Sequence, residues 1–157
     1  MDKKKDNPGI VIPPPIIYLA VFAAGIFLQR IIPISKSFFK TRGSGIIGIV
    51  LIAISMVFGL AALERFFKTR NTVITVKPAT SLQTGGIYSV TRNPMYVGVL
   101  FLYTGLAFLI GNWWNIILLP FLILIIQGYV IHREEKYLMR RFGDDYKKYK
   151  TKVRRWI

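Results

Sequence analysis

Four stretches of mostly apolar residues, separated by polar and charged segments, dominate the pattern along the chain. A helix needs about 20 consecutive apolar residues to cross the hydrocarbon core of a bilayer, and each stretch is close to that length. The pattern predicts membrane-spanning helices at residues 14–32, 44–63, 94–110 and 113–131. We therefore expect an all-α polytopic membrane protein with about four transmembrane helices.

The third and fourth stretches are separated only by Gly111 and Asn112. A glycine followed by a short polar residue is a strong turn signal, so the two helices should form a tight hairpin. Trp113 and Trp114 follow this turn directly. Because amphipathic aromatic rings favour the membrane–water boundary, the turn should lie at that boundary.

The polar tail after the fourth stretch also has helical periodicity. Apolar and aromatic residues recur there at intervals of three and four, which places them on one face of a helix. The residues on this face are Ile131, Glu135, Leu138, Phe142, Tyr146, Tyr149 and Val153. Gly143 should interrupt the helix, so the tail is predicted to form two short amphipathic helices.

Composition changes this picture little but narrows the function. The 157 residues allow one domain, 1–157, and 53% of them are hydrophobic, yet the net charge is +15. A soluble basic domain would suggest nucleic acid, but here the charges lie between and after the apolar stretches. The chain has no cysteine, which excludes disulfides and thiolate chemistry, and it has one histidine. We expect no metal and no nucleic-acid partner.

The distribution of basic residues predicts the topology. With four spans, the N-terminus, the loop of residues 64–94 and the tail share one side, which holds 18 of the 22 Lys and Arg residues. Loops rich in Lys and Arg stay in the cytoplasm. Both termini should therefore be cytoplasmic, in the plasma membrane if the protein is prokaryotic.

Two adjacent carboxylates, Glu134 and Glu135, stand out immediately after the fourth span. Glu135 lies in register with the inward face of the tail, where a carboxylate suggests a cationic partner. The plainer explanation is local pairing on the surface, for example of Glu135 with Arg133 or Arg140, which would contribute little stability.

A second feature is the segment Arg92-Asn93-Pro94-Met95-Tyr96-Val97-Gly98. Pro94 suits the first turn of the third span, and Asn93 can serve as its N-cap. The free amides of a helix start, together with Arg92, would attract a carboxylate or phosphate. Arg92 and Tyr96 could equally mark only the membrane boundary. The preceding Gly85-Gly86-Ile87-Tyr88 is a turn that allows close backbone approach to a ligand.

These segments together form a recognisable pattern across a two-helix hairpin. Its parts are Gly-Ile-Tyr at 86–88, Arg-Asn-Pro-Met-Tyr-Val-Gly at 92–98, Glu-Glu at 134–135 and Phe-Gly-x-x-Tyr-x-x-Tyr at 142–149. In this order the pattern resembles the isoprenylcysteine carboxyl methyltransferase and phospholipid methyltransferase superfamily of integral membrane enzymes. The resemblance covers about residues 80–155.

The resemblance implies S-adenosylmethionine as methyl donor, bound at the cytoplasmic membrane face by segments 72–93 and 132–157. The cofactor-binding positions it implies are Thr80, Ser81, Leu82, Gln83, Tyr88, Asn93, Pro94, Met95, Tyr96, Glu134 and Glu135. The residues expected at the reacting groups are Arg92, Tyr96 and Glu134. The charges of these residues suit the donor. Glu134 can bind the ammonium of the donor, and the helix start can bind its carboxylate with the help of Arg92.

Two residues depart from the family pattern. Asn93 stands where the family usually has His, and Val130 stands where prenylcysteine methyltransferases have an Arg associated with the acceptor carboxylate. The second departure argues against a strict prenylcysteine acceptor.

The sequence thus predicts a membrane methyltransferase that uses S-adenosylmethionine on a small lipophilic acceptor, in the manner of the isoprenylcysteine enzymes. A phospholipid amine acceptor is the alternative within the enzyme class. The alternative outside it is a non-enzymatic membrane protein whose basic tail binds anionic lipid headgroups. A headgroup binder, however, has no use for Glu134 on an inward face.

Overall fold

A computed structural model describes residues 7–68 and 80–157 and shows an all-helical chain, as expected. The described elements are α1 (Pro14–Ile31), η1 (Ser37–Lys40), α2 (Arg42–Lys68), η2 (Gly86–Ser89), α3 (Pro94–Ile110), α4 (Trp113–Ile125), the π-helical η3 (Ile126–Ile131) and α5 (His132–Lys152). Residues 72–79 of the expected cofactor-binding segment and Lys3 to Lys5 lie outside the described residues.

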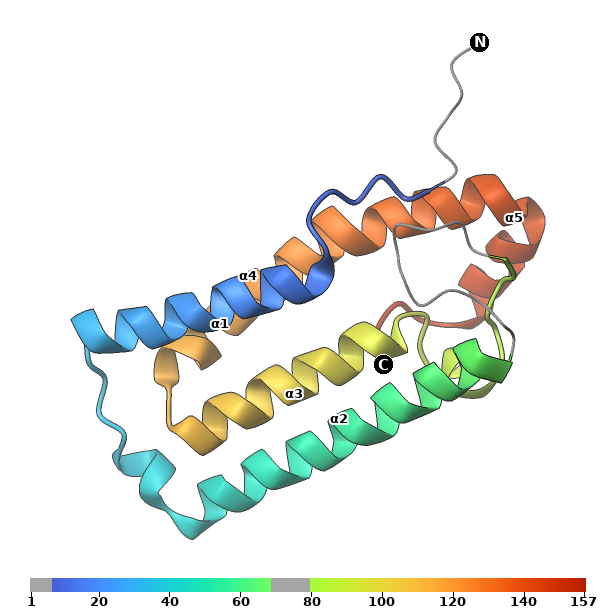
Figure 1. Cartoon of the computed structure of the whole chain (residues 1–157). Helices are drawn as coiled ribbons and strands as arrows, with labels where there is room; N and C mark the ends of the chain where they lie inside the picture. Colours follow the sequence, from blue (N-terminus) through green and yellow to red (C-terminus); the bar gives the residue numbers. More distant parts are fainter. Residues whose placement is uncertain (1–6, 69–79) are drawn as a thin grey trace.

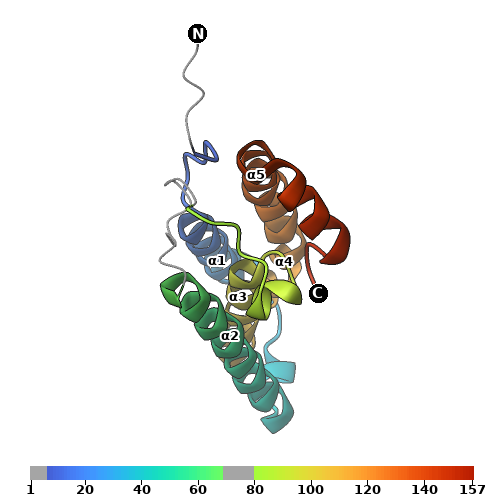
Figure 2. The same cartoon turned by 90° about the vertical axis from the view of Figure 1, so that its right-hand side faces the viewer.

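The four long apolar helices run alternately up and down, with α1 beside α4 and α2 beside α3 (Figure 1). Both the described start of the chain and its polar tail lie at one end of this bundle, and the tail packs across that end (Figure 2). A core of apolar and tyrosine side chains from α1, α3, α4 and η3 joins the two pairs.

Three helices in the described part of the chain are long and apolar enough to cross a membrane. They are Pro14–Ile31, Arg42–Arg65 and a continuous helix from Trp113 to Lys152, whose apolar part gives way to polar α5 after Ile131. The remaining predicted span, α3, is an apolar helix of 17 residues. At 1.5 Å per residue it extends roughly 25 Å, somewhat less than a hydrocarbon core of about 30 Å.

Small residues allow α2 and α3 to lie very close together. A Cβ added to Gly105 would lie 2.8 Å from the carbonyl oxygen of Gly48, and one added to Gly98 would lie 3.3 Å from the backbone nitrogen of Gly59. In a membrane, where water does not drive helices together, such close backbone packing is a main source of helix–helix attraction. The α2–α3 pair therefore provides a firm support for the start of α3.

The turn between α3 and α4 is the tight hairpin that the sequence predicts. Gly111 adopts a left-handed conformation with φ 66°, which glycine accepts without steric cost. The Asn112 side chain accepts from the backbone N–H of Asn115 and donates to the carbonyl of Gly25, so it caps α4 and fastens it to α1. At the same end, the indoles of Trp113 and Trp114 donate to loop carbonyls at Ser35 and Ile32.

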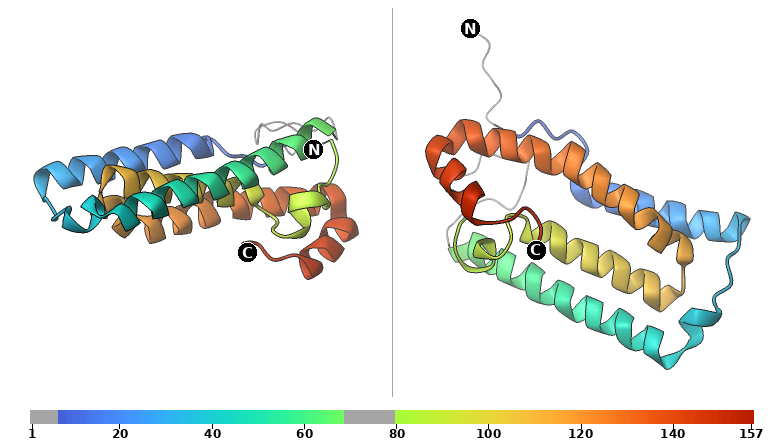
Figure 3. Two further views of the ribbon diagram at one scale, coloured as in Figure 1. Left: turned by 90° about the horizontal axis from the view of Figure 1, so that it is seen from below. Right: turned by 180° about the vertical axis from the view of Figure 1, so that it is seen from behind.

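At the other end the fourth span continues through η3 into α5 without a break (Figure 3). As predicted, Gly143 then interrupts the helix, with φ 50° and ψ −121°. The second half of α5 turns back toward the bundle, which the sequence did not indicate. Tyr146, Tyr149 and Val153 face inward from this second half and pack against Leu82, Leu138 and Phe142. The bend thus places the end of the tail beside the loop that precedes α3.

Candidate functional site

Glu134 lies in the first turn of α5, where the polar tail leaves the membrane-spanning helix. The hydroxyl of Tyr96 donates to its Oε1 at 2.7 Å. Among the described residues no Lys, Arg or His forms an ion pair with Glu134, although its side chain is half-buried. The pKa of Glu134 is raised to about 7, mainly because burial disfavours the charged carboxylate. The Tyr96 hydrogen bond lowers this pKa and the neighbouring Glu135 charge raises it, both by less than burial does. The site therefore holds a carboxylate with no cationic partner in the described part of the chain.

Tyrosines surround this carboxylate. Tyr96 and Tyr88 are each 8% exposed, and both lie near Glu134. Tyr18 of α1, 5% exposed, donates to the backbone carbonyl of Tyr96 at 3.4 Å. The first span thus reaches the site, which the sequence did not indicate because that span carries no recognisable motif.

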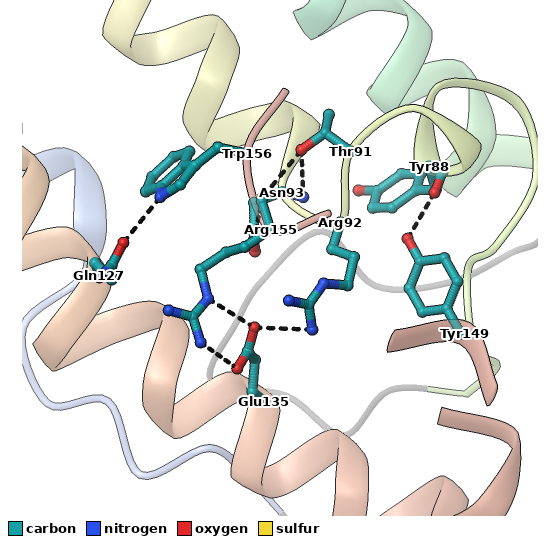
Figure 4. Close-up of polar contacts among 9 residues, drawn as sticks. All are labelled: Tyr88, Thr91, Arg92, Asn93, Gln127, Glu135, Tyr149, Arg155 and Trp156. Carbon is teal, nitrogen blue, oxygen red and sulfur yellow. Dashed lines mark hydrogen bonds and ion pairs between the residues drawn. The ribbon is translucent and has the colours of Figure 1, made fainter. Parts of the chain in front are cut away.

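Glu135, the next residue in the helix, is paired with two arginines. Its carboxylate accepts two hydrogen bonds from Arg155, at 3.0 and 2.8 Å, and lies 3.1 Å from Nη1 of Arg92 (Figure 4). Burial favours the protonated acid, but these two guanidinium groups outweigh it and lower the pKa of Glu135. The surface pairing with Arg133 or Arg140 considered above is wrong, because the bend at Gly143 brings the distant Arg155 into position.

Arg92 is an arginine whose capacity to donate is only partly used. Its side chain is 9% exposed, and its Nε has no hydrogen-bond partner among the described residues. With Arg155 it shares a single carboxylate, so the three side chains carry a surplus of one positive charge. A buried guanidinium in this state favours a further anion.

Asn93 occupies the N-cap position of α3, but its side chain does not cap the helix. It donates instead to the carbonyl of Arg155 at 2.9 Å, and the Thr91 hydroxyl donates to the same carbonyl at 3.0 Å. The expected side-chain cap is therefore absent, because the returning tail offers a competing acceptor. The first amides of α3 are left without a side-chain cap.

The C-terminal tail holds the loop before α3 in place through further contacts (Figure 4). Tyr149 donates to the carbonyl of Tyr88 at 2.6 Å, and Trp156 donates to the Gln127 side chain in η3 at 2.9 Å. Arg155, Trp156 and Gln127 were missed by the sequence analysis. A tryptophan beside an arginine at the end of a basic tail was the available signal, but it does not identify a partner.

The remaining predicted positions lie on the same side of the bundle and differ in exposure. Thr80 is exposed, whereas Ser81 and Leu82 are half-buried. Gln83 is 7% exposed and donates to the Ser81 hydroxyl at 2.8 Å, and its Oε1 has no partner among the described residues.

Pro94 is buried and Met95 half-buried at the start of α3. Leu82 packs in the cluster of Tyr146 and Tyr149, so the loop and the tail close on one another.

Within residues 7–68 and 80–157, the site therefore offers a carboxylate that no cation pairs, with Tyr88 and Tyr96 near it, and a buried guanidinium with an unused donor. This arrangement suits a zwitterionic ligand whose ammonium meets Glu134 and whose carboxylate meets Arg92 and the α3 amides. No group of three His, Asp or Glu side chains within residues 7–68 and 80–157 could hold a metal ion.

A family model described as phospholipid methyltransferase matches residues 44–145, which include Arg92, Tyr96 and Glu134 but neither α1 nor Arg155. An uncharacterized protein of Haemophilus influenzae is 41% identical over 66 residues, which is 40% of this chain and all of that protein.

A protein-S-isoprenylcysteine O-methyltransferase of Schizosaccharomyces pombe is 38% identical over 72 residues. These residues are 46% of this chain but only 30% of the fission yeast protein, so the match is partial. No solved structure gives a significant match.

Proposed function

Since this chain belongs to the phospholipid methyltransferase family, we propose that it transfers a methyl group from S-adenosylmethionine to a small lipophilic acceptor at the cytoplasmic membrane face. The match of residues 44–145 and the partial likeness to an isoprenylcysteine enzyme support membrane methyltransferase chemistry in general. The cofactor, the acceptor and the roles of individual residues are our inference from the site.

The observation that carries the proposal is the unpaired carboxylate of Glu134. A chain with net charge +15 offers many cations, yet this half-buried carboxylate has none beside it among the described residues and is held by the Tyr96 hydroxyl. Leaving a carboxylate in such surroundings costs free energy unless a ligand supplies the missing cation. The ammonium of S-adenosylmethionine is such a cation.

Arg92 would bind the carboxylate of the donor, next to the ammonium that Glu134 would bind. Its unpartnered Nε and the uncapped amides at the start of α3 would bind the donor carboxylate, while Glu135 and Arg155 keep the guanidinium fixed. The loop residues Thr80 to Gln83 and Tyr88, with Asn93 to Met95, would bound the rest of the donor. When bound, S-adenosylmethionine supplies a methyl group on a sulfonium, whose charge the rings of Tyr88 and Tyr96 would stabilise.

Such a transfer needs alignment more than acid or base chemistry, and the chain provides alignment. Tyr96 holds Glu134, Tyr18 contacts the carbonyl of Tyr96, and Tyr149 fixes the carbonyl of Tyr88. These three contacts tie α1, α3, α5 and the preceding loop together around the proposed methyl position. Exact positioning of two reactants can supply a large part of a rate enhancement.

The acceptor is proposed to be lipophilic, since the site adjoins the apolar core of a membrane-spanning bundle. Val130, where prenylcysteine enzymes carry an arginine, is fully buried among apolar residues and offers no charge to an acceptor carboxylate. A phospholipid amine is the second candidate, favoured by the description of the matching family. With the basic end of the bundle in the cytoplasm, both termini would be cytoplasmic.

Methyl transfer can be tested with radiolabelled S-adenosylmethionine and the purified protein in nanodiscs containing total lipid extract. Label should enter a lipid-extractable product, and alkaline hydrolysis then separates methyl esters, which release the label, from stable methylamines. Glu64→Gln, on the exposed end of α2, is the control and should match the wild type. If the wild type labels no lipid, thiol or carboxyl acceptor, the proposed activity is wrong.

A further inference from the structure

The outward face of α4 and α5 changes character abruptly where the apolar span ends. Along α4 the exposed side chains are large and apolar, including Phe121 at 61% and Leu124 at 64% exposure. Along the first half of α5 the exposed side chains include the cations Arg133, Lys136 and Arg140. Since η3 joins the two helices without a break, the cationic residues follow the apolar span along one continuous helix (Figure 3).

The three cations lie on one side of α5. Their spacing of three and four residues places them within about 60° of one another around the helix axis, since each residue turns the helix by about 100°. None forms an ion pair with a described carboxylate. The cluster therefore presents its charge outward, directly next to the surface that acyl chains would cover.

Arg133 is held in place rather than free to turn. Its guanidinium stacks on the Tyr129 ring at 4.2 Å from the centroid. The Tyr129 hydroxyl in turn accepts from the backbone N–H groups of Val11 and Ile12, at 3.1 and 3.0 Å. This arrangement fixes a guanidinium at the level where the apolar surface ends, which lowers the entropy cost of binding a phosphate there.

We propose that Arg133, Lys136 and Arg140 form a binding site for the phosphate of an anionic phospholipid, whose acyl chains lie along Phe121 and Leu124. Charge complementarity and the exposed apolar side chains of α4 select this occupant. A soluble anion would not use the apolar surface, and a neutral lipid would not use three cations. The same helix carries Glu134 and Glu135 on its inner side. An anionic lipid bound there would thus stabilise the position of α5, and this effect does not depend on which reaction the site performs.

The chain provides a matched control in the second half of α5. Lys147, Lys148 and Lys152 are equally exposed, but they lie beyond the bend at Gly143, where the helix has left the line of α4 (Figures 1 and 3). Replacing these three by glutamine removes the same charge as replacing Arg133, Lys136 and Arg140. A simple effect of net charge on membrane affinity would change both triple variants alike.

The test is lipid retention in native mass spectrometry after transfer from nanodiscs of equal parts phosphatidylcholine and phosphatidylglycerol. The wild type and the Lys147/Lys148/Lys152→Gln variant should retain phosphatidylglycerol selectively. Since each basic residue near an anionic surface changes affinity about fivefold, Arg133/Lys136/Arg140→Gln should reduce the retention on the order of a hundredfold.

Equal retention by the two triple variants, or no preference of the wild type for phosphatidylglycerol, would overturn the proposal. If the Arg133 triple variant is unstable in detergent, a salt titration of the wild type decides instead. Because screening weakens exposed charge pairs, phosphatidylglycerol should be released as salt rises and phosphatidylcholine should not. Retention that is insensitive to salt would count against the site equally.

Discussion

Tyr96 and Glu134, 38 residues apart in the chain, are joined by a 2.7 Å hydrogen bond from the tyrosine hydroxyl to Oε1 of the carboxylate. The bond connects the first turn of α3 to the first turn of α5. It places a carboxylate without a described cationic partner beside the tyrosine-rich end of the bundle. Several measurable properties depend on this contact.

Replacing Tyr96 by phenylalanine removes a hydrogen bond that favours the charged form of Glu134. The pKa of Glu134 should therefore rise from about 7. If the ammonium of S-adenosylmethionine requires the charged carboxylate, binding weakens about tenfold per pH unit below that pKa. Titration calorimetry as a function of pH should show the midpoint shifted upward in Tyr96→Phe. An unchanged midpoint would mean that the hydroxyl does not control Glu134.

The stability of the ligand-free protein should also depend on pH through Glu134. Its pKa in the folded protein, about 7, lies above the ordinary value of 4.5, so the folded state binds more protons between these two values. Stability is therefore greatest below pH 4.5 and is lost as pH rises to about 7. In thermal unfolding in detergent, Glu134→Gln should lack this decline relative to the wild type. A parallel pH profile in the two proteins would contradict the raised pKa.

Truncation of Arg155 should loosen the loop that precedes α3. Arg155→Ala removes two hydrogen bonds to a buried carboxylate, at a cost of about 2 kcal/mol. Arg154→Ala is the matched control, because this neighbour is exposed and only its backbone carbonyl contacts Arg92. Thermal unfolding should show a lower midpoint for Arg155→Ala alone, and Arg155→Lys should recover part of the loss. Similar midpoints for both alanine variants would mean that the Arg155–Glu135 contact does not stabilise the loop.

Replacing Gly25 and Gly59 by alanine should change the stability of the protein in opposite directions. A Cβ on Gly25 would lie 2.0 Å from Oδ1 of Asn115, so overpacking should destabilise Gly25→Ala by about 1–3 kcal/mol. Gly59 has nothing within 4 Å of such a Cβ, and alanine there should stabilise the helix by up to about 1 kcal/mol. Unfolding in a denaturing detergent, followed by circular dichroism, measures both. Equal effects would mean that α1 and α4 do not pack at this point.

Much of the helical organisation could be predicted from local signals. Runs of apolar residues predicted the helices, Gly111 and Asn112 predicted the hairpin turn, and Gly143 predicted the bend in the tail. Each depends on backbone preferences within a few residues, which sequence patterns record well. The boundaries of α3 agree because Pro94 starts the helix and Gly111 ends it.

The contacts that build the site could not be predicted in the same way. Glu135 takes its partner from 20 residues further along, and Asn93 gives up its capping role to the carbonyl of Arg155. Both depend on the tail folding back, a tertiary event that leaves no periodic signal. Tyr18 reaches Tyr96 from a span without a motif, so only the packing of α1 identifies it.

Calorimetry of S-adenosylmethionine binding to the detergent-solubilised wild type, Glu134→Gln and Glu64→Gln tests whether Glu134 binds the donor ammonium. Glu64 is an exposed carboxylate paired with Lys68, so its replacement controls for the loss of one charge. The wild type and Glu64→Gln should bind alike. Glu134→Gln should bind about tenfold to a hundredfold more weakly, since a charged hydrogen bond contributes about 1.5–3 kcal/mol. Absence of binding by the wild type, or equal binding by all three proteins, would contradict this role of Glu134.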